Sequence, residues 1–181
     1  MFVNDEKKIA FIHIPKTGGT AVARYILWPI GFRKTEGPRH GGYIPISNKY
    51  FVFSFVRNPY EVIVSRYRER ALMKCNFRDK YPTVRSFIEF LIEDYKEFPK
   101  PLRQVDFLDP CVEIYRFENL EDGINDICER FKLDKPVIDK NSVNKFHGEY
   151  DWKDWVTPED IYFINDYFHE DFSLGYDKWM P

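Results

Sequence analysis

Six consecutive residues near the N-terminus have side chains suited to binding phosphate. They are Pro15, Lys16, Thr17, Gly18, Gly19 and Thr20. They follow an apolar run over residues 9–14 that is typical of a buried strand. The two glycines let the backbone approach phosphate oxygens because they carry no Cβ, while the lysine adds a charge and the threonines add hydroxyl donors. At a helix start, unpaired N–H groups and the helix dipole also favour an anion. The motif therefore predicts a site that binds the phosphate of a nucleotide.

Two other interpretations of this motif remain open. It differs from the GxxxxGK[ST] loop of kinases and ATPases because its lysine precedes the glycines. No acidic strand end suited to Mg²⁺ follows it either, so a nucleotide kinase is the less favoured enzyme. An ordinary strand-to-helix turn that happens to contain two glycines is the remaining alternative.

A second candidate site follows the next apolar run, residues 50–56. Arg57 comes directly after this run, and Ser65 lies six residues beyond Pro59, about 9 Å along the expected helix. Ligands of parallel sheets bind beyond the carboxyl ends of the strands, so Arg57 is expected at the same edge as the first motif. We expect Arg57 and Ser65 to hold one phosphate while the first motif holds another. A nucleotide with phosphates at two places on its ribose needs such a pair of sites.

The remaining pattern predicts an α/β fold. Thr20 is expected to cap a first helix, and Asn58 with Pro59 is expected to begin a second that runs to about Lys74. The expected strands cover residues 9–14, 50–56 and 112–115, the expected helices cover residues 21–27, 58–74, 84–95, 120–131 and a segment from 158, and residues 31–42 are expected to be a loop. Strands separated by helices predict a P-loop-like central parallel sheet flanked by helices on both faces, in a single domain over residues 1–181.

Composition restricts the class of protein further. The net charge of −2 gives no overall signature of a nucleic-acid-binding protein. No apolar run approaches the length of a membrane span, the acids near the N-terminus do not fit a signal peptide, and no metal-ligand cluster appears. A cytoplasmic protein without a metal and without nucleic-acid or membrane partners is expected. Residues 57–85 carry eight Lys or Arg against three Asp or Glu, so this stretch either faces an anionic ligand or forms solvated helix faces.

The two motifs resemble those of the carbohydrate sulfotransferases, the Golgi and heparan type of sulfotransferase family 2. The family's 5′-phosphosulfate loop is similar to HIPKTGGTS, and residues 13–21 read HIPKTGGTA. The family's 3′-phosphate motif is similar to RNPYDRLVSAY, and residues 57–67 read RNPYEVIVSRY. Residues 104–108, 115–120, 143–145 and 171–176 resemble later landmarks of the family in the expected order. The resemblance implies a sulfotransferase fold and the co-substrate 3′-phosphoadenosine-5′-phosphosulfate (PAPS).

The resemblance also implies roles for individual residues. Lys16 would stabilise the leaving oxygen, and His40 would be the base that takes the proton of a hydroxyl acceptor, with a solvent-exposed loop histidine as the alternative. Asn144 and Lys145 would lie in the segment that covers the nucleotide. Val62 stands where the family often has an arginine, which keeps open a non-catalytic nucleotide-binding module. The acceptor is expected to be a small molecule or a glycan, and the sequence gives no oligomeric state.

Overall fold

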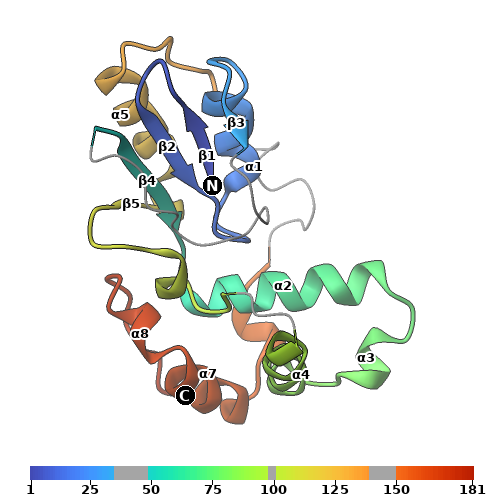
Figure 1. Ribbon diagram of the computed structural model, residues 1–181. Coiled ribbons are helices and arrows are strands. Elements are labelled where there is room, and N and C mark those ends of the chain that lie inside the picture. Colours follow the sequence, from blue (N-terminus) through green and yellow to red (C-terminus); the bar gives the residue numbers. More distant parts are fainter. Residues whose placement is uncertain (35–48, 98–100, 139–149) are drawn as a thin grey trace. The chain divides into compact units, whose positions relative to one another are not determined.

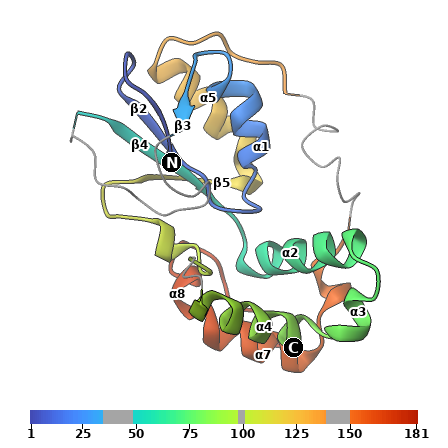
Figure 2. The ribbon, with the colours of Figure 1, turned by 45° about the vertical axis from the view of Figure 1, so that its right-hand side comes forward.

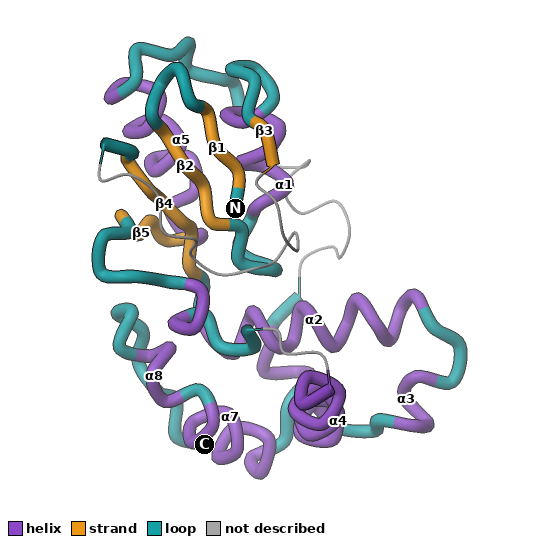
Figure 3. The backbone as a smooth tube through the Cα atoms, viewed as in Figure 1, coloured by secondary structure: helices purple, strands orange, loops and turns teal. Residues whose placement is uncertain are grey.

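The computed structural model describes residues 1–34, 49–97, 101–138 and 150–181 (Figure 1). The chain forms two compact units, each made of two separate segments. Unit 1 contains Met1–Arg57 and Asp106–Lys145, and unit 2 contains Asn58–Val105 and Phe146–Pro181. Unit 1 carries all the strands of the described residues, whereas the described part of unit 2 is helical (Figure 3). The organisation of residues 1–181 as a single domain stays a prediction.

Unit 1 is built on a five-stranded sheet with the order β3-β1-β2-β4-β5. The strands are β1 (Phe2–Asn4), β2 (Ile9–Ile12), β3 (Arg33–Lys34), β4 (Phe51–Val56) and β5 (Glu113–Arg116). The predicted parallel arrangement is confirmed for β2, β4 and β5. The strand β1 was not predicted, and it pairs antiparallel with β2 and β3. The reason is that only four residues join β1 to β2, far fewer than a parallel crossover needs. The strand β3 also falls at the start of the segment predicted to be a loop.

Helical segments cover one face of this sheet. They are α1 (Gly19–Val22), the π-helical η1 (Ala23–Leu27), the 3₁₀ turn η3 (Phe117–Asn119) and α5 (Leu120–Arg130). Phe11, Phe53 and Phe55 point from alternate strand positions into one apolar cluster with these helices. Gly123 allows α5 to approach closely, because a Cβ there would lie 2.9 Å from the ring of Phe55. The sequence period of two in the strands thus fixes which side chains meet the helices.

Unit 2 packs helices around its own apolar core. They are α2 (Pro59–Met73), α3 (Phe77–Lys80), α4 (Val84–Glu97), η4 (Trp152–Trp155), α7 (Pro158–Tyr167) and α8 (His169–Phe172), and η2 (Val105–Phe107) follows where the chain returns to unit 1. The start of α2 is confirmed, since the Asn58 side chain accepts a hydrogen bond of 3.0 Å from the Tyr60 N–H. Trp152 stacks on Tyr60 with ring centroids 4.4 Å apart, so this aromatic side chain serves packing. No helix in the described ranges has both the length and the apolar character to cross a membrane.

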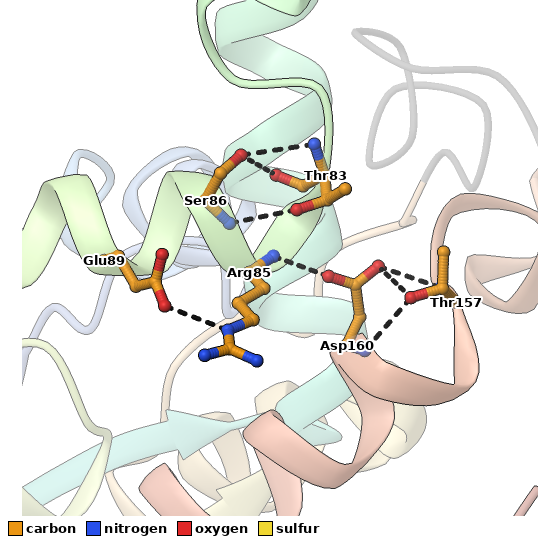
Figure 4. Close-up of polar contacts among 6 residues, drawn as sticks. All are labelled: Thr83, Arg85, Ser86, Glu89, Thr157 and Asp160. Carbon is orange, nitrogen blue, oxygen red and sulfur yellow. Dashed lines mark hydrogen bonds and ion pairs between the residues drawn. The ribbon is translucent and has the colours of Figure 1, made fainter.

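A buried carboxylate joins the starts of α4 and α7 (Figure 4). Asp160 is 2% exposed, and its Oδ1 accepts a hydrogen bond of 2.6 Å from the backbone N–H of Arg85. Its Oδ2 accepts a hydrogen bond of 2.8 Å from the backbone N–H of Thr157, whose hydroxyl oxygen in turn accepts from the Asp160 N–H. This reciprocal capping box satisfies N–H groups at the beginning of two helices at once.

Candidate functional site

The loop between β2 and α1 has an alternating backbone conformation. Lys16 and Gly18 have positive φ angles of 70° and 87°, whereas Thr17 between them and Gly19 after them do not. In anion-binding nests, where right-handed and left-handed residues alternate, successive backbone N–H groups point toward one side. The positive φ angles at Lys16 and Gly18 fit such a loop, and phosphate binding by it stays a prediction.

The helix after this loop begins two residues earlier than predicted. Gly18, in the left-handed region, is the N-cap, and its carbonyl oxygen accepts from the N–H groups of Ala21 (2.9 Å) and Val22 (3.1 Å). The prediction that Thr20 is the cap is wrong, because only glycine adopts this φ without strain and the helix has already started at Gly19. Within the described residues, the N–H groups of Gly19 and Thr20 have no acceptor, so both are available to an anion.

One of the two threonines is used inside the loop. Thr17 is fully buried, and its hydroxyl donates a hydrogen bond of 3.0 Å to the carbonyl of Ile14. This bond closes the turn after β2, so the structure assigns Thr17 Oγ1 to loop geometry. Thr20 is exposed on the first turn of the helix, where its hydroxyl is accessible.

Both glycines sit against aromatic rings that leave no room for a side chain. A Cβ at Gly18 would lie 2.7 Å from the ring of Phe117, and a Cβ at Gly19 would lie 2.0 Å from the ring of His13. His13 is itself buried, with 7% exposure, and its ring stacks on Phe11 at 5.9 Å. His13 is therefore a buried residue that packs against the sheet. The close approach of the loop to the sheet explains why both positions are glycine.

Arg57 lies directly after β4 and contacts the same loop. Its guanidinium carbon is 4.4 Å from the centroid of the Phe117 ring, which is a cation–π distance. Its Nη1 donates a hydrogen bond of 3.4 Å to the carbonyl of Lys16. The structure thus brings the Arg57 guanidinium to the backbone of the first motif, as expected for strand ends on one sheet edge.

Phe117 is a site residue that sequence reasoning missed. Its ring contacts the Gly18 backbone on one side and supports the Arg57 guanidinium. The residue belongs to the YRFENL segment, residues 115–120, which carried only a weak resemblance. No local signal distinguishes it from a core phenylalanine, since its role arises from the pairing of β4 with β5.

The other predicted site residues are placed as follows. Ser65 is 3% exposed on α2, and Val62 is 5% exposed one turn earlier. Ser65 belongs to unit 2 and Arg57 to unit 1, so their shared phosphate site stays a prediction. His40, Asn144 and Lys145 lie outside the described residues.

The arrangement in unit 1 is suited to an oxyanion. Backbone N–H groups at the helix start, the nearby Lys16 side chain and the Arg57 guanidinium are all donors, and two of them carry full positive charge. Donors of this kind are suited to binding a phosphate and to stabilising negative charge on a leaving oxygen.

Comparison with known proteins identifies one family. The family model described as "Sulfotransferase family" matches residues 1–176 of the 181-residue chain. The search of curated proteins and the search of solved structures each returned no match.

Proposed function

The chain belongs to the sulfotransferase family, and we propose that it transfers a sulfuryl group from PAPS to a hydroxyl group of a carbohydrate acceptor. Family membership supports sulfotransfer in general; the donor and the acceptor are the proposed part. One observation carries the proposal of PAPS. The loop with alternating φ at Lys16 and Gly18 lies in contact with Arg57, which follows the neighbouring strand.

Lys16 and Arg57 have different roles in this proposal. The loop and Lys16 hold the 5′-phosphosulfate, and Arg57 binds the 3′-phosphate together with Ser65. Asn144 and Lys145 complete the nucleotide site. PAPS differs from ATP in having this 3′-phosphate, so Arg57 is the residue that should discriminate between the two nucleotides.

The reaction resembles phosphoryl transfer in its demands on the protein. The acceptor oxygen attacks sulfur in line, the bond between sulfur and the 5′-phosphate oxygen breaks, and 3′,5′-bisphosphoadenosine leaves. Lys16 and the N–H groups of Gly19 and Thr20 stabilise the negative charge on the departing phosphate. The proton of the acceptor hydroxyl goes to a base, for which His40 is the candidate because a neutral imidazole is suited to this task near pH 7.

A non-catalytic nucleotide-binding module is the second candidate function. The observation that favours it is Val62, an apolar side chain 5% exposed at a position where the related motif has arginine. This alternative shares the nucleotide site and differs only in turnover, so a turnover assay separates the two candidates.

The first experiment is thermal unfolding with 3′,5′-bisphosphoadenosine, 5′-AMP or ATP, all without Mg²⁺. A ligand present at a hundred times its Kd adds about 2.7 kcal/mol to stability, which for a chain of this size raises Tm by roughly 5–10 °C. We expect this rise for the bisphosphate alone, and we expect Arg57→Ala to remove it. Arg24→Ala is the matched control, because it removes the same charge from an exposed position of unit 1.

Three outcomes separate the candidates. Equal shifts with all three nucleotides, or an unchanged shift in Arg57→Ala, would refute the PAPS site. A selective shift together with release of bisphosphoadenosine from PAPS that depends on an added glycan supports the sulfotransferase. A selective shift without such release across uronic-acid and amino-sugar glycans favours the non-catalytic module.

A further inference from the structure

Unit 2 contains a cavity of about 770 Å³. Residues from the end of α2, the short helix α3 and α4 line it, and Figure 2 shows how these three helices are arranged. Four aromatic side chains line it, and they are Phe77, Tyr81, Phe90 and Tyr95. Phe90 is 36% exposed although it is a large apolar residue, so its ring is accessible to a ligand. A volume between roughly 300 and 1,000 Å³ with mostly apolar walls is typical of sites for small organic molecules.

Cations lie at regular spacing along the helix that forms one wall of this cavity. Arg66 and Arg70 are four residues apart on α2, so they share one face of the helix, and Lys74 follows as the extended C-cap residue. Arg70 and Lys74 line the cavity. Within the described ranges, their side chains form no hydrogen bond or ion pair with the protein. Their position near the helix C-terminus suits the dipole, but it leaves both charges available to a ligand.

The first cation of this series is buried. Arg66 is 8% exposed, and its Nη1 donates a hydrogen bond of 3.3 Å to the carbonyl of Leu102. Its Nε and Nη2 are buried and have no hydrogen-bond partner in the described part of the chain. Burial lowers the pKa of the Arg66 guanidinium, and the nearby Tyr95 and Asp171 oppose that effect. Because an arginine keeps its charge even so, it adds positive potential beside Tyr95, which lines the cavity.

The charge around the cavity therefore favours an anion. Lys80 also lines it, and the two acids in its lining are Asp79 and Asp94. The lining thus contains three cations, Arg70, Lys74 and Lys80, against these two acids. This cluster lies within the basic stretch of residues 57–85, for which an anionic ligand or a solvated helix face was expected.

We propose that this cavity binds an amphiphilic anion, whose apolar rings pack between Phe77, Phe90 and Tyr95 and whose sulfonate, sulfate or carboxylate group pairs with Arg70 and Lys74. Rings stack on aromatic side chains, and charge-assisted hydrogen bonds hold the anionic group. The site is formed entirely within unit 2 and does not depend on the proposed nucleotide site.

The test uses the aromatic sulfonate 8-anilinonaphthalene-1-sulfonate on the full chain, with its fluorescence as the readout. We expect saturable binding of one equivalent, weakened at least tenfold in Arg70→Ala/Lys74→Ala. The matched control is Arg24→Ala/Lys34→Ala, which removes two exposed cations from unit 1 and should leave binding unchanged. Trp28→Ala controls for adsorption to an exposed aromatic ring, since Trp28 is 69% exposed.

The neutral probe N-phenyl-1-naphthylamine tests the need for the charge, and we expect it to bind at least tenfold more weakly. Equal binding of the two probes, or equal binding by Arg70→Ala/Lys74→Ala and the wild type, would overturn the proposal. Far-UV circular dichroism and Tm must match the wild type for each variant, and the exposure of Arg70 and Lys74 makes this the expected result.

A chemical readout locates the probe. Cys75 lines the cavity and is exposed, Cys111 is exposed in unit 1, and Cys128 is buried. In a Cys111→Ser background, saturating 8-anilinonaphthalene-1-sulfonate should slow the reaction of Cys75 with a thiol reagent at least fivefold. An unchanged rate would place the probe elsewhere and overturn the assignment of this cavity.

Discussion

Replacing Gly19 by alanine tests how the phosphate loop is held against the sheet. The added Cβ would lie 2.0 Å from Cδ2 and Nε2 of His13, well inside van der Waals contact. The ring cannot move away freely, because His13 is 7% exposed and packs on Phe11 at 5.9 Å and on Phe2 at 6.4 Å. Either the helix start or the histidine must shift, and both changes disturb the loop.

The size of the effect follows from two opposing terms. Overpacking a well-packed site costs about 1–3 kcal/mol, while alanine in a helix is favoured over glycine by roughly 0.5–1 kcal/mol. We therefore expect Gly19→Ala to lower the free energy of unfolding by about 1–2 kcal/mol. For a chain of 181 residues this is a fall in Tm of roughly 2–8 °C. Affinity for 3′,5′-bisphosphoadenosine should fall at the same time because the Gly19 N–H moves.

A double-mutant cycle with His13→Ala identifies the cause. Urea unfolding should show that Gly19→Ala is costly with His13 present and neutral or stabilising in the His13→Ala background, which gives a coupling energy of about 1–3 kcal/mol. The same loss in both backgrounds would refute the steric argument. Gly18→Ala is the comparison, since its φ of 87° is strained for any L-residue. Phe117→Ala should therefore rescue Gly18→Ala only in part.

Three further predictions concern other parts of the chain. Lys16→Ala should lower turnover roughly 10²–10³-fold, the usual effect of removing a transition-state donor, with a less than tenfold change in bisphosphoadenosine affinity; parallel losses would contradict that role. Asp160→Ala should lower the free energy of unfolding by about 2–4 kcal/mol because it leaves N–H groups of two helices unpaired, whereas Glu89→Ala, which removes only the exposed 2.9 Å pair with Arg85, should cost less than about 0.5 kcal/mol in urea unfolding. Burial raises the pKa of Tyr60. The contribution of Tyr60 to the free energy of unfolding is therefore complete below the unfolded pKa of about 10 and is lost as pH rises through the folded pKa. Between pH 8 and 11, the free energy of unfolding measured in urea should fall more steeply for the wild type than for Tyr60→Phe.

Local signals allowed parts of the fold to be predicted from the sequence. The Asn58–Pro59 pair predicted the start of α2 because a cap and a fixed φ act within one turn. The apolar run of β4 was predicted within one residue, because a strand buried on both faces is apolar throughout. The strand β1 has only three residues, and its place in the sheet depends on antiparallel pairing with β2. Such pairing has no signature in a segment this short.

In the candidate site, too, features with a local sequence signal were predicted, and features that depend on tertiary packing were not. The residue types of the loop, with Lys16 before two glycines, predicted an anion site from the sequence, and the φ angles at Lys16 and Gly18 fit that prediction. The contact between Arg57 and the Lys16 carbonyl was expected only as a shared sheet edge, because the distance depends on the register of β2 with β4. The cavity beside α2 was not predicted at all. Residues 57–85 showed an excess of positive charge, but the cavity is lined by residues from three helices, α2, α3 and α4, and so depends on how these helices pack.

The two glycines of the loop combine the demands of folding and of binding. The sequence suggested that glycine serves the ligand, since a bare backbone approaches phosphate closely. In the structure, the space that each Cβ would occupy is filled by a ring of the protein itself, Phe117 for Gly18 and His13 for Gly19. Within the described residues, the N–H groups of Gly19 and Thr20 in the same loop have no acceptor. Glycine is therefore required even without ligand, and a variant such as Gly19→Ala should lose stability before any nucleotide is added. Destabilising the loop will by itself weaken nucleotide binding. Only a loss of affinity larger than this indirect effect would show that the glycine also serves contact with the phosphate.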